Sequence, residues 1–589
     1  MVASVPLLLL FFPPLALAAV YQDVKQLPTT IFDFVIIGGG TAGAVVANRL
    51  TENPAFDVLV IEAGPTNDGV LNSMVPTFAS SLEKTIYDWN YTTLPGLGMN
   101  NRSIDYPRGR ILGGSSSHNA MFYTRGSSDD YDRWARVTCD SGWSWKNVMP
   151  YILKSERWSP PSDHHNTQGE FDPSMHGLDG LLLTSLPGYP QPADDMVRLV
   201  SKQLPQEFPF LLDMNAGRPL GLGFYQGTIG NGTRSSSATA YLSATFTARP
   251  NLHILLNTKL IRLHTSSKKK MTFNSVELDD PSSPRLMARK ELILAAGPIN
   301  TPRILMNSGI GDREELKRIG IETILNLPSV GKNFTDQPFT SISYSVSSND
   351  TLDNLHNNAT LQAEALSQWM QNRTGPYVNG GSTYIGWSRL PSDSPVLKNF
   401  GDPSAGINTP HIELAPSTGT GLFVSPTPGG HFIGMGIIIV TPASRGSVTL
   451  NATDPLGKPL IDLGFYSSGF DLPAMREAIK LAERFYKAPI WNSYIIEQVA
   501  PISANLSDSE IDEYIRAMTF SSAHGIGTAA MSARNASYGV VNPDLLLKGA
   551  SGLRIVDASV LPFINCGHTQ APVYAIAERA SDLIKAAWK

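Results

Sequence analysis

The sequence predicts an α/β fold with a second domain of the α+β class, and three observations lead to that prediction. Residues 34–37 and 57–61 are short apolar runs around a glycine-rich turn and a helical pattern at 44–50, the order of a parallel βαβ unit. Residues 432–440 and 446–450 alternate as strands of an antiparallel sheet do. The chain has 589 residues, too many for one compact core.

The βαβ unit contains glycines with the spacing G-x-G-x-x-G. Gly38 permits a tight turn, Gly40 lets the backbone approach a pyrophosphate, and Gly43 lets the helix pack closely on the strand. Glu62 closes the second strand, near the separation of ~20 residues typical of an acid that binds a ribose. The unit therefore predicts a Rossmann-like dinucleotide site, and the motif alone does not choose between FAD and NAD.

The start of the helix and a second small-residue stretch extend this site. Unpaired N–H groups at the amino end of a helix favour phosphates. Residues 106–126 are rich in small side chains, so their backbone can lie flat against a planar ligand. The candidate cofactor contacts of these two segments are Gly38, Gly40, Thr41, Ala42, Gly43, Glu62, Ala63, Gly113, Ser117, His118, Asn119, Ala120 and Phe122.

The chain returns to the nucleotide-binding domain late in the sequence. Residues 252–264 and 291–296 are expected to be further strands of that domain, and 552–562 a strand with Asp557 near its end, followed by a helix. A carboxylate there can meet ribityl or phosphate groups. The candidate contacts of these segments are Leu260, Asp557, Ala558, Thr569 and Gln570. The predicted nucleotide-binding domain is thus discontinuous, with segments 31–150, 230–334 and 540–589.

The predicted substrate-binding domain comprises residues 151–229 and 335–539. We expect helices at 473–487 and 508–517. Residues 160–230 are rich in proline and glycine and are expected to be irregular. Residues 349–379 are polar without clear periodicity, which predicts either a lid or a plain surface insertion.

The amino terminus predicts secretion to the extracellular space. Residues 1–19 contain an apolar stretch that ends in small residues, as signal peptides do, although Lys and Arg are absent before it. A membrane anchor is the alternative, and two prolines and the short length argue against it. Ten glycosylation sequons support a secreted glycoprotein: Asn90, Asn101, Asn231, Asn333, Asn349, Asn358, Asn372, Asn451, Asn505 and Asn535.

The charge limits the classes of binding partner, and the cysteine content limits disulfides and metal sites. A net charge of −5 and 16% charged residues give no indication of nucleic acid or of an anionic membrane. Cys139 and Cys566 could form one disulfide or remain two buried thiols. No histidine and cysteine cluster has zinc spacing, so we predict no metal, and we expect a monomer.

Two histidines near the carboxyl end stand among small residues: His524 in SSAHG and His568 in CGHTQAP. Either one alone would be an ordinary structural histidine. Together with VIIGGGTAGAVVANRL, GRILGGSSSHNAMFYTRG and AAGPINTPRILMNSGIG they form blocks in a characteristic order. In these blocks the chain resembles the glucose-methanol-choline oxidoreductase family, from about residue 31 to the end.

The resemblance implies FAD as cofactor, a Rossmann-like FAD domain, and a substrate domain in which helices cover an antiparallel sheet. It implies oxidation of an alcohol, with hydride moving to the flavin. Its catalytic pair falls on His524 and His568. By resemblance His524 is the general base, and His568 orients the hydroxyl and stabilises the developing alkoxide. An imidazole suits such a role because it titrates near neutral pH.

Within that family the chain looks most like fungal pyranose dehydrogenases, whose histidine at the position of His118 is covalently bound to the flavin. We therefore expect a covalent FAD, and the alternative is a histidine that only hydrogen-bonds the flavin or a backbone carbonyl. Residues 411–419 lack the glutamine expected by resemblance, and Ser522 and Ala523 replace a bulkier pair. These changes could open the pocket, which Tyr87, Tyr91 and Phe122 could line.

The sequence supports several functions. The first is a secreted FAD-dependent enzyme that oxidises a pyranose or glycoside hydroxyl and passes the electrons to quinone-like acceptors. The second is an aryl-alcohol oxidase that releases H2O2. A hydroxynitrile lyase that keeps FAD without redox turnover, and a binding glycoprotein with a silent site, are further alternatives.

Overall fold

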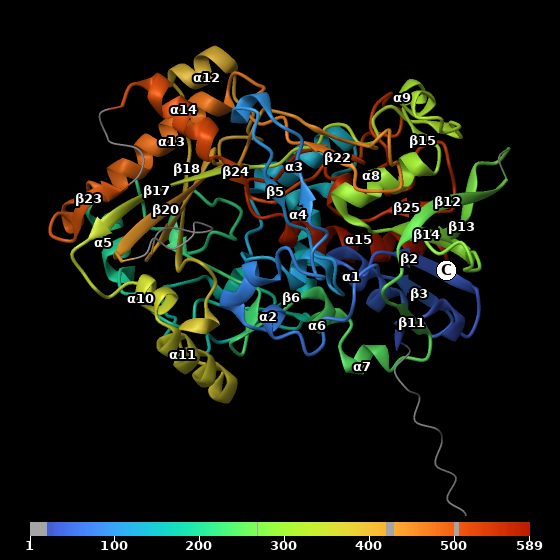
Figure 1. Cartoon of the computed structure of the whole chain (residues 1–589), viewed down its shortest axis with the longest axis horizontal. Helices are drawn as coiled ribbons and strands as arrows, with labels where there is room; N and C mark the ends of the chain where they lie inside the picture. Colours follow the sequence, from blue (N-terminus) through green and yellow to red (C-terminus); the bar gives the residue numbers. More distant parts are fainter. Residues whose placement is uncertain (1–19, 268, 420–428, 500–505) are drawn as a thin grey trace, which may run out of the picture.

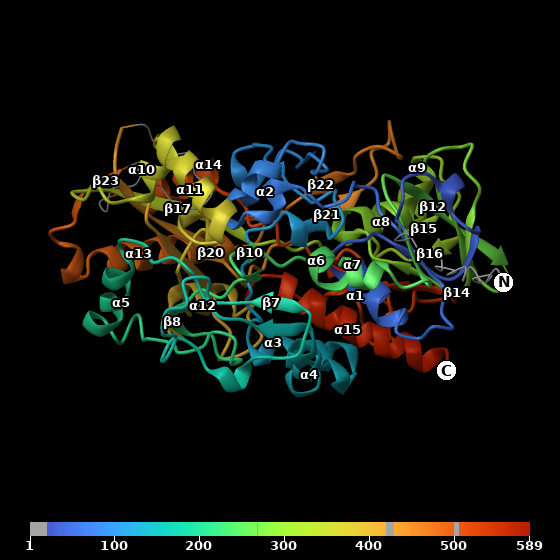
Figure 2. The same cartoon turned by 90° about the horizontal axis from the view of Figure 1, so that it is seen from below.

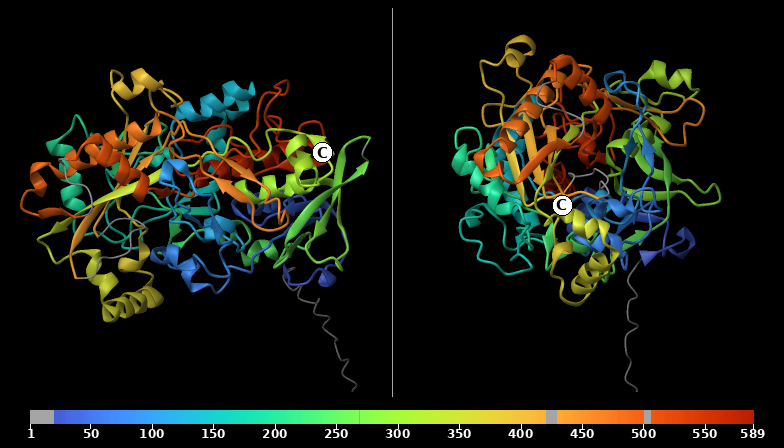
Figure 3. Two further views of the ribbon diagram at one scale, coloured as in Figure 1. Left: turned by 45° about the horizontal axis from the view of Figure 1, so that its top comes forward. Right: turned by 60° about the vertical axis from the view of Figure 1, so that its left-hand side comes forward.

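A computed structural model of the chain describes residues 20–267, 269–419, 429–499 and 506–589 (Figure 1). The predicted signal peptide and the sequon at Asn505 lie outside the described residues. Two large sheets lie toward opposite ends of the molecule, with helices between and around them (Figures 1 and 3).

The first sheet is mixed, and its central strands are parallel. Its order is β1-β11-β3-β2-β14-β13-β12, and β25 pairs with β14 in parallel. Strands β12 and β13 form an antiparallel hairpin at one edge. Its strands are β1 (Val20–Tyr21), β2 (Ile31–Ile37), β3 (Val58–Ile61), β11 (Leu252–Leu255), β12 (Leu260–Ser267), β13 (Thr272–Leu278), β14 (Leu286–Leu294) and β25 (Leu553–Ile555). Buried on both faces, β2 and β3 are nearly continuous apolar runs, as expected for central parallel strands.

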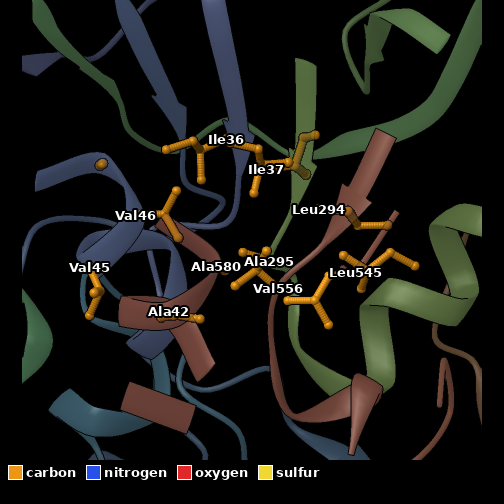
Figure 4. Packing of buried hydrophobic residues seen from close by; sticks show 14 of the residues in the cluster. Ile36, Ile37, Ala42, Val45, Val46, Leu294, Ala295, Leu545, Val556 and Ala580 are labelled. Carbon is orange, nitrogen blue, oxygen red and sulfur yellow. The ribbon is translucent and has the colours of Figure 1, made fainter. Parts of the chain in front are cut away.

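Helices cover this sheet, and the last helix of the chain packs beside the first (Figure 2). The helices here are α1 (Thr41–Leu50), α4 (Trp145–Ser155), α6 (Ser237–Tyr241), α8 (Gly297–Asn307) and α15 (Gln570–Ala587). Arg49 of α1 pairs with the buried Glu578 of α15 at 2.8 Å. Side chains such as Ile36, Val46 and Val556 from the sheet and its helices meet in one core (Figure 4). The two ends of the chain therefore form a single unit.

The second sheet is antiparallel, with the order β23-β17-β20-β19-β18-β8, and β24 pairs with β17. Helices α13 (Asp471–Tyr486) and α14 (Asp508–Met518) pack against it. Its strands are β8 (Gly221–Phe224), β17 (Pro338–Val346), β18 (Tyr384–Ser388), β19 (Ile412–Ser417), β20 (Phe432–Ile439), β23 (Ile495–Val499) and β24 (Phe520–Ser521). The exact division of the chain into two domains stays a prediction.

The remaining helices and paired strands lie around the two sheets. The helices are α2 (Leu71–Met74), α3 (Ser128–Thr138), α5 (Asp194–Gln203), α7 (Ala244–Thr247), α9 (Arg313–Arg318), α10 (Leu352–Asn357), α11 (Ala359–Asn372) and α12 (Pro395–Phe400). Paired short strands are β4 (Tyr91–Thr92) with β5 (Asp105–Tyr106), β6 (Glu156–Trp158) with β7 (Leu182–Thr184), β9 (Ile229–Gly230) with β10 (Thr233–Arg234), β15 (Ile310–Gly311) with β16 (Leu325–Asn326), and β21 (Ser447–Thr449) with β22 (Leu460–Asp462).

The expectation that residues 160–230 are irregular was wrong. Residues 160–230 contain helix α5, and residues 349–379 contain α10 and α11. In α11 only Ala365 and Trp369 are buried, so its apolar periodicity is weak, and its start depends on Asn358 capping two backbone N–H groups. Strand β21 pairs with β22 outside the large antiparallel sheet.

The cysteines do not pair, because Cys139 is exposed and Cys566 is buried, and both are free. Among the described residues, no helix combines the length and hydropathy that crossing a bilayer requires. Within the same part of the chain, no group of three or more His, Cys, Asp or Glu is placed to hold a metal ion.

Candidate functional site

A cavity of about 590 Å³ lies where the first sheet faces the second. One end is lined by Ile37 and Ile61, at the carboxyl ends of β2 and β3. The other end is lined by Phe339, Glu413 and Ile438, which come from β17, β19 and β20. Ligands of parallel α/β sheets bind at the carboxyl ends of the strands, so the cavity occupies the expected crevice.

The glycine motif shapes the first end of the cavity. Gly38 has φ +104°, and a Cβ there would lie 2.4 Å from the carbonyl oxygen of Ala295. A Cβ on Gly43 would lie 1.9 Å from the carbonyl oxygen of Gly38, so only glycine lets α1 approach the turn. Helix α1 begins after Gly40 without a side-chain cap, and Thr41 and Ala42 line the cavity. The first N–H groups of α1 are therefore available to an anion.

Glu62 is held at the end of β3 by the backbone. Its two carboxylate oxygens accept hydrogen bonds from the N–H groups of Gly39 at 2.8 Å and Gly64 at 2.7 Å. Burial raises the pKa of Glu62 to about 7, and these hydrogen bonds act against the increase. The side chain lines the cavity and keeps lone pairs that a ribose diol can use.

His118 follows the 3-10 helix η4 (Gly114–Ser117) and lines the cavity. Its Nε2 atom is buried and has no hydrogen-bond partner among the described residues, whereas the ring also interacts with the backbone of Leu82. Burial lowers the pKa of His118 to about 4, so the imidazole is neutral near pH 7. The next residue, Asn119, accepts a hydrogen bond from Arg234 at 2.8 Å and donates one to Gln570 at 3.1 Å. This small-residue stretch is thus fixed against α15.

His524 and His568 meet at the other end of the cavity, where their ring centroids lie 4.8 Å apart at 83°. The Nε2 atom of Gln337 donates to the carbonyl groups of Val440 at 2.8 Å and Asn565 at 3.1 Å. Its Oε1 atom consequently faces Nδ1 of His524, at 2.6 Å. Because an amide oxygen only accepts, Nδ1 carries the proton and Nε2 of His524 keeps its lone pair.

Thr124 positions the second histidine. Its hydroxyl oxygen accepts the backbone N–H of His568 at 2.7 Å and lies 2.9 Å from Nδ1 of that ring. Asn215 fixes the backbone on both sides of Thr124. It accepts a hydrogen bond from the N–H of Arg125 at 2.7 Å and donates one to the carbonyl of Tyr123 at 3.0 Å. The ring of Phe122 stacks on His568 with centroids 4.5 Å apart.

Both histidines are neutral at ordinary pH. Burial, and then the charge of Arg108, lower the pKa of His524 to about 3. Burial, and then the neighbouring His524, hold the pKa of His568 well below its ordinary value. The expectation that this imidazole titrates near neutral pH was therefore wrong for His524. Its neutral ring keeps a lone pair on Nε2 that no hydrogen bond in the described chain uses, so the pair can deprotonate a hydroxyl placed between the rings.

The segment that carries His524 is held by a buried carboxylate. Asp336 accepts hydrogen bonds from the backbone N–H of His524 at 2.9 Å and from the hydroxyl of Tyr106 at 2.8 Å. Ala523, directly before the histidine, has φ +56°, a conformation uncommon for residues other than glycine. A fixed and locally strained backbone thus sets the position of His524.

Comparison with known proteins agrees with this geometry. Two models of the GMC oxidoreductase family match residues 32–339 and 442–577. The chain belongs to the GMC oxidoreductase family. It is an FAD-dependent oxidoreductase that acts on CH–OH donors.

This GMC oxidoreductase is similar to fungal proteins over nearly its full length. It is 42% identical to pyranose dehydrogenase 3 of Leucoagaricus meleagris, over 96% of this chain and 95% of that one. Its structure resembles formate oxidase of Aspergillus oryzae with a TM-score of 0.87 at 30% identity, covering 95% of this chain and 98% of that chain. It also resembles a fungal aryl-alcohol oxidase, with a TM-score of 0.83 at 26% identity over 95% of this chain and 99% of that chain.

Most of the predicted site residues of this GMC oxidoreductase line the cavity. They are Gly38, Gly40, Thr41, Ala42, Glu62, Ala63, His118, Asn119, Ala120, Phe122, Leu260, His524, Asp557, Ala558, His568, Thr569 and Gln570. Asp557 also accepts hydrogen bonds from the N–H of Gly297 at 2.9 Å and the hydroxyl of Thr301 at 2.6 Å.

Gly43, Gly113 and Ser117 are not among the residues that line the cavity. Gly43 has the packing role predicted for it, between α1 and the glycine turn. The hydroxyl of Ser117 donates to the carbonyl of Leu112 at 2.8 Å, and a Cβ on Gly113 would meet that hydroxyl at 2.2 Å. Gly113 and Ser117 therefore determine the conformation of the loop without lining the cavity themselves. Of the predicted aromatic residues, Tyr91 and Phe122 line the cavity and Tyr87 does not.

Sequence reasoning missed Gln337, Thr124 and Glu413. Gln337 lies in a stretch without a motif, and Thr124 lies in the block GRILGGSSSHNAMFYTRG, where nothing local marks its contact with a histidine. Only the tertiary structure brings the two residues to the histidines. The sequence contains a signal for Glu413, because it is a charged residue near the start of the strand β19, whose remaining residues are mostly apolar.

Proposed function

We propose that this protein is a secreted dehydrogenase that oxidises a sugar hydroxyl, of a pyranose or a glycoside, to a carbonyl and passes the electrons to quinone-like acceptors. The observation that supports this most is the pair of neutral histidines in one cavity, one of which has a free Nε2. The 42% identity to a pyranose dehydrogenase supports a sugar as the substrate. The protein would act as a monomer.

In this proposal His524 accepts the hydroxyl proton at Nε2, because Gln337 keeps the proton of the ring on Nδ1. Thr124 has already accepted the backbone N–H of His568, and its own hydrogen can be donated to Nδ1 of that ring. The Nε2 proton of His568 then donates to the substrate oxygen and stabilises the developing alkoxide.

The residues present fit FAD. The uncapped start of α1 suits the pyrophosphate, and Glu62 suits the ribose. FAD supplies the hydride acceptor when it is bound. His118 lines the cavity, and its neutral imidazole has an Nε2 atom without a hydrogen-bond partner in the described chain, which supports a covalent bond to the flavin.

Exposure of the glycosylation sequons supports secretion. Among those in the described chain, six asparagines are exposed: Asn101, Asn231, Asn349, Asn358, Asn372 and Asn535. Asn333 instead uses both amide atoms, donating to the carbonyl of Pro562 and accepting from Arg445. We expect glycans on the six exposed sites and none on Asn333.

An aryl-alcohol oxidase is the second candidate. Five aromatic side chains line the cavity, and such a lining also suits an aromatic alcohol. They are Trp89, Tyr91, Phe122, Phe339 and Phe520. The structural similarity to a fungal aryl-alcohol oxidase favours the same candidate function.

Anaerobic reduction of the flavin separates the candidates. Glucose and then veratryl alcohol are added while the flavin absorbance is followed, and air is then admitted. Bleaching by glucose with slow recovery in air supports the sugar dehydrogenase, whereas bleaching by veratryl alcohol with fast recovery supports the oxidase. Reduction by neither compound contradicts both. His524→Ala should keep the flavin but slow its reduction at least ~10²-fold.

A further inference from the structure

A cluster of buried charged residues lies outside the cavity. Its members are Arg125, Glu156, His176 and Asp213, which are at most 6% exposed and do not line the cavity. Arg125 pairs with Glu156 at 2.7 Å. Charged side chains are rarely buried unless they are paired, and taking four of them out of water is costly. The contacts of the cluster indicate what it holds in place.

His176 carries a positive charge within this cluster. Its Nδ1 atom lies 3.0 Å from Oε1 of Glu156, and its Nε2 atom lies 2.9 Å from Oδ2 of Asp213. An ionised carboxylate only accepts hydrogen bonds, so both ring nitrogens must carry hydrogen. Burial acts to lower the pKa of His176, but the hydrogen bonds to Asp213 and Glu156 raise it above its ordinary value. The two positive and two negative side chains thus balance in charge.

Asp213 connects the cluster to Asn215. One of its oxygens, Oδ1, accepts the backbone N–H of Asn215 at 2.8 Å and the side-chain amide of Gln226 at 3.2 Å. The other, Oδ2, accepts the backbone N–H of Asp172 at 3.0 Å and the ring N–H of His176. The side chain of Asn215 in turn donates to that of Gln226. Four donors therefore hold one carboxylate, and its position determines that of Asn215.

Asn215 connects the cluster to the cavity. Its side chain bonds to the backbone of Tyr123 and Arg125, on both sides of Thr124. Its carbonyl accepts a hydrogen bond from the Arg125 guanidinium at 3.1 Å, so the cluster contacts this segment a second time. The hydroxyl of Thr124 contacts both the backbone N–H and Nδ1 of His568. Hydrogen bonds and one short backbone segment therefore join the cluster to His568.

We propose that His176 and Asp213 are positioning residues for the oxidation, and that they act on the ring of His568. Their contacts fix Asn215, which fixes the backbone around Thr124. Loss of the charge on His176 would leave the two carboxylates with one positive partner, which is unfavourable inside a protein. The groups bonded to Asp213 would then shift, and a displacement of ~1 Å at a group that contacts the substrate can slow a reaction by up to ~10²-fold. The inference rests on the proposed function, because it assumes that His568 contacts the substrate oxygen.

Two substitutions disturb this path without touching the cavity. His176→Gln removes the charge and keeps an amide that can reach one carboxylate. Gln226→Met keeps the approximate volume and removes the contacts of that side chain with Asp213 and Asn215. It tests the same path even if His176→Gln does not fold.

Glu291→Gln is the matched control. Glu291 forms another buried ion pair, with Arg554 at 2.6 Å, in the first sheet and outside the path to His568. The variant should lower the melting temperature and keep the limiting rate of flavin reduction within about twofold. It therefore reports what the loss of a buried charge pair alone does to the reaction.

The first measurement is stopped-flow reduction of the flavin by glucose under anaerobic conditions. His176→Gln should lower the limiting rate about fivefold, and Gln226→Met about threefold, because both displace His568. The apparent affinity for glucose should stay within about twofold, since the path reaches His568 and leaves the other cavity walls unchanged. A limiting rate that is unchanged in both variants would overturn the inference.

A double-mutant cycle with Thr124→Val shows whether the effect passes through Thr124. In that variant His568 has already lost the contact that the path controls, so adding His176→Gln should change the limiting rate by less than about twofold. A further loss of about fivefold would show that His176 acts by another route, and the inference would be wrong.

The ring nitrogen signals of His568 give a test that needs no substrate. In FAD-loaded protein with nitrogen-labelled histidine, these NMR signals are identified by their absence in His568→Gln. They should shift in His176→Gln and stay in place in Glu291→Gln, and unchanged signals in His176→Gln would contradict the inference. If glucose does not reduce the flavin, the proposed function fails, and this spectrum alone decides the inference.

Discussion

The side-chain oxygen of Gln337 lies 2.6 Å from Nδ1 of His524, and this contact determines which nitrogen of the ring can accept a proton. The orientation of the amide is itself determined, because its nitrogen donates to two backbone carbonyl groups. A residue from the segment before β17 thus controls the protonation of a histidine nearly two hundred positions later in the chain.

Replacing Gln337 should change the pH dependence of the reaction. With the pKa of His524 at about 3, flavin reduction in the wild type should show no acidic decline between about pH 5 and 7. Gln337→Glu places a negative charge beside Nδ1, which raises the pKa of His524 and moves the acidic decline to higher pH. Stopped-flow reduction across this pH range measures the shift.

Gln337→Met is the matched control, because it removes the acceptor without adding charge. It should slow reduction about tenfold and leave the pH profile flat. A profile that is the same in Gln337→Glu and the wild type would show that Gln337 does not act on His524.

His118→Val should release the flavin from the protein. Valine has no nucleophilic nitrogen, so the FAD should become extractable with acid, whereas that of the wild type stays with the precipitated protein. The absorbance of the supernatant after acid precipitation reports this result. Flavin that remains attached in His118→Val would place the covalent bond on another residue.

Thr124 should matter to catalysis through the ring of His568. Thr124→Val is nearly isosteric but removes the hydroxyl that contacts the backbone N–H and Nδ1 of His568. We expect flavin reduction to slow about tenfold, the effect of ~1.4 kcal/mol. The limiting rate of flavin reduction should fall in Thr124→Val, and the apparent affinity for the substrate should stay unchanged. Thr124→Ser keeps the hydroxyl and should restore most of the rate, and a serine variant as slow as the valine variant would contradict this role.

A buried histidine outside the cavity should make stability depend on pH. His176 lies between Glu156 at 3.0 Å and Asp213 at 2.9 Å, and Arg125 pairs with Glu156 at 2.7 Å. Burial alone would lower the pKa of His176, but its hydrogen bonds to Asp213 and Glu156 outweigh burial and raise it.

A raised folded-state pKa means that the protonated histidine stabilises the fold. This contribution is complete below the unfolded pKa of about 6.5 and is lost as the pH rises through the folded value. The melting temperature should therefore fall from pH 6.5 toward the alkaline side, by roughly 1 °C for each kcal/mol lost, because the unfolding entropy grows with chain length. His176→Gln should melt lower at pH 6.5 and show a weaker alkaline decline. An equally steep decline in that variant would assign the effect to other groups.

The sequence predicted the parts of the site that consist of local patterns. The glycines at 38, 40 and 43 and the strands around them form a unit whose spacing follows from backbone geometry, and the structure places it as expected. His524 and His568 were found because each lies in a family block, and not because their spacing implies contact.

Long-range partners could not be predicted in this way. Nothing local in the sequence shows that Gln337 meets His524 or that Thr124 meets His568, since these contacts arise only when the two sheets close on the cavity. Helix α11 was missed because only two of its side chains are buried, too few for a clear apolar stripe. Helix α5 is amphipathic, with Val197 and Val200 buried, but the proline- and glycine-rich sequence around it hid the pattern.

The position of β25 and α15 has a consequence for biosynthesis. Both come from the end of the chain, yet β25 pairs with β14 and α15 packs against α1. During synthesis, β14 therefore lacks its pairing with β25, and α1 lacks its contact with α15, until these two segments have emerged. Asp557, His568 and Gln570 line the cavity, so the cavity lacks these walls until the segment that carries them has been made.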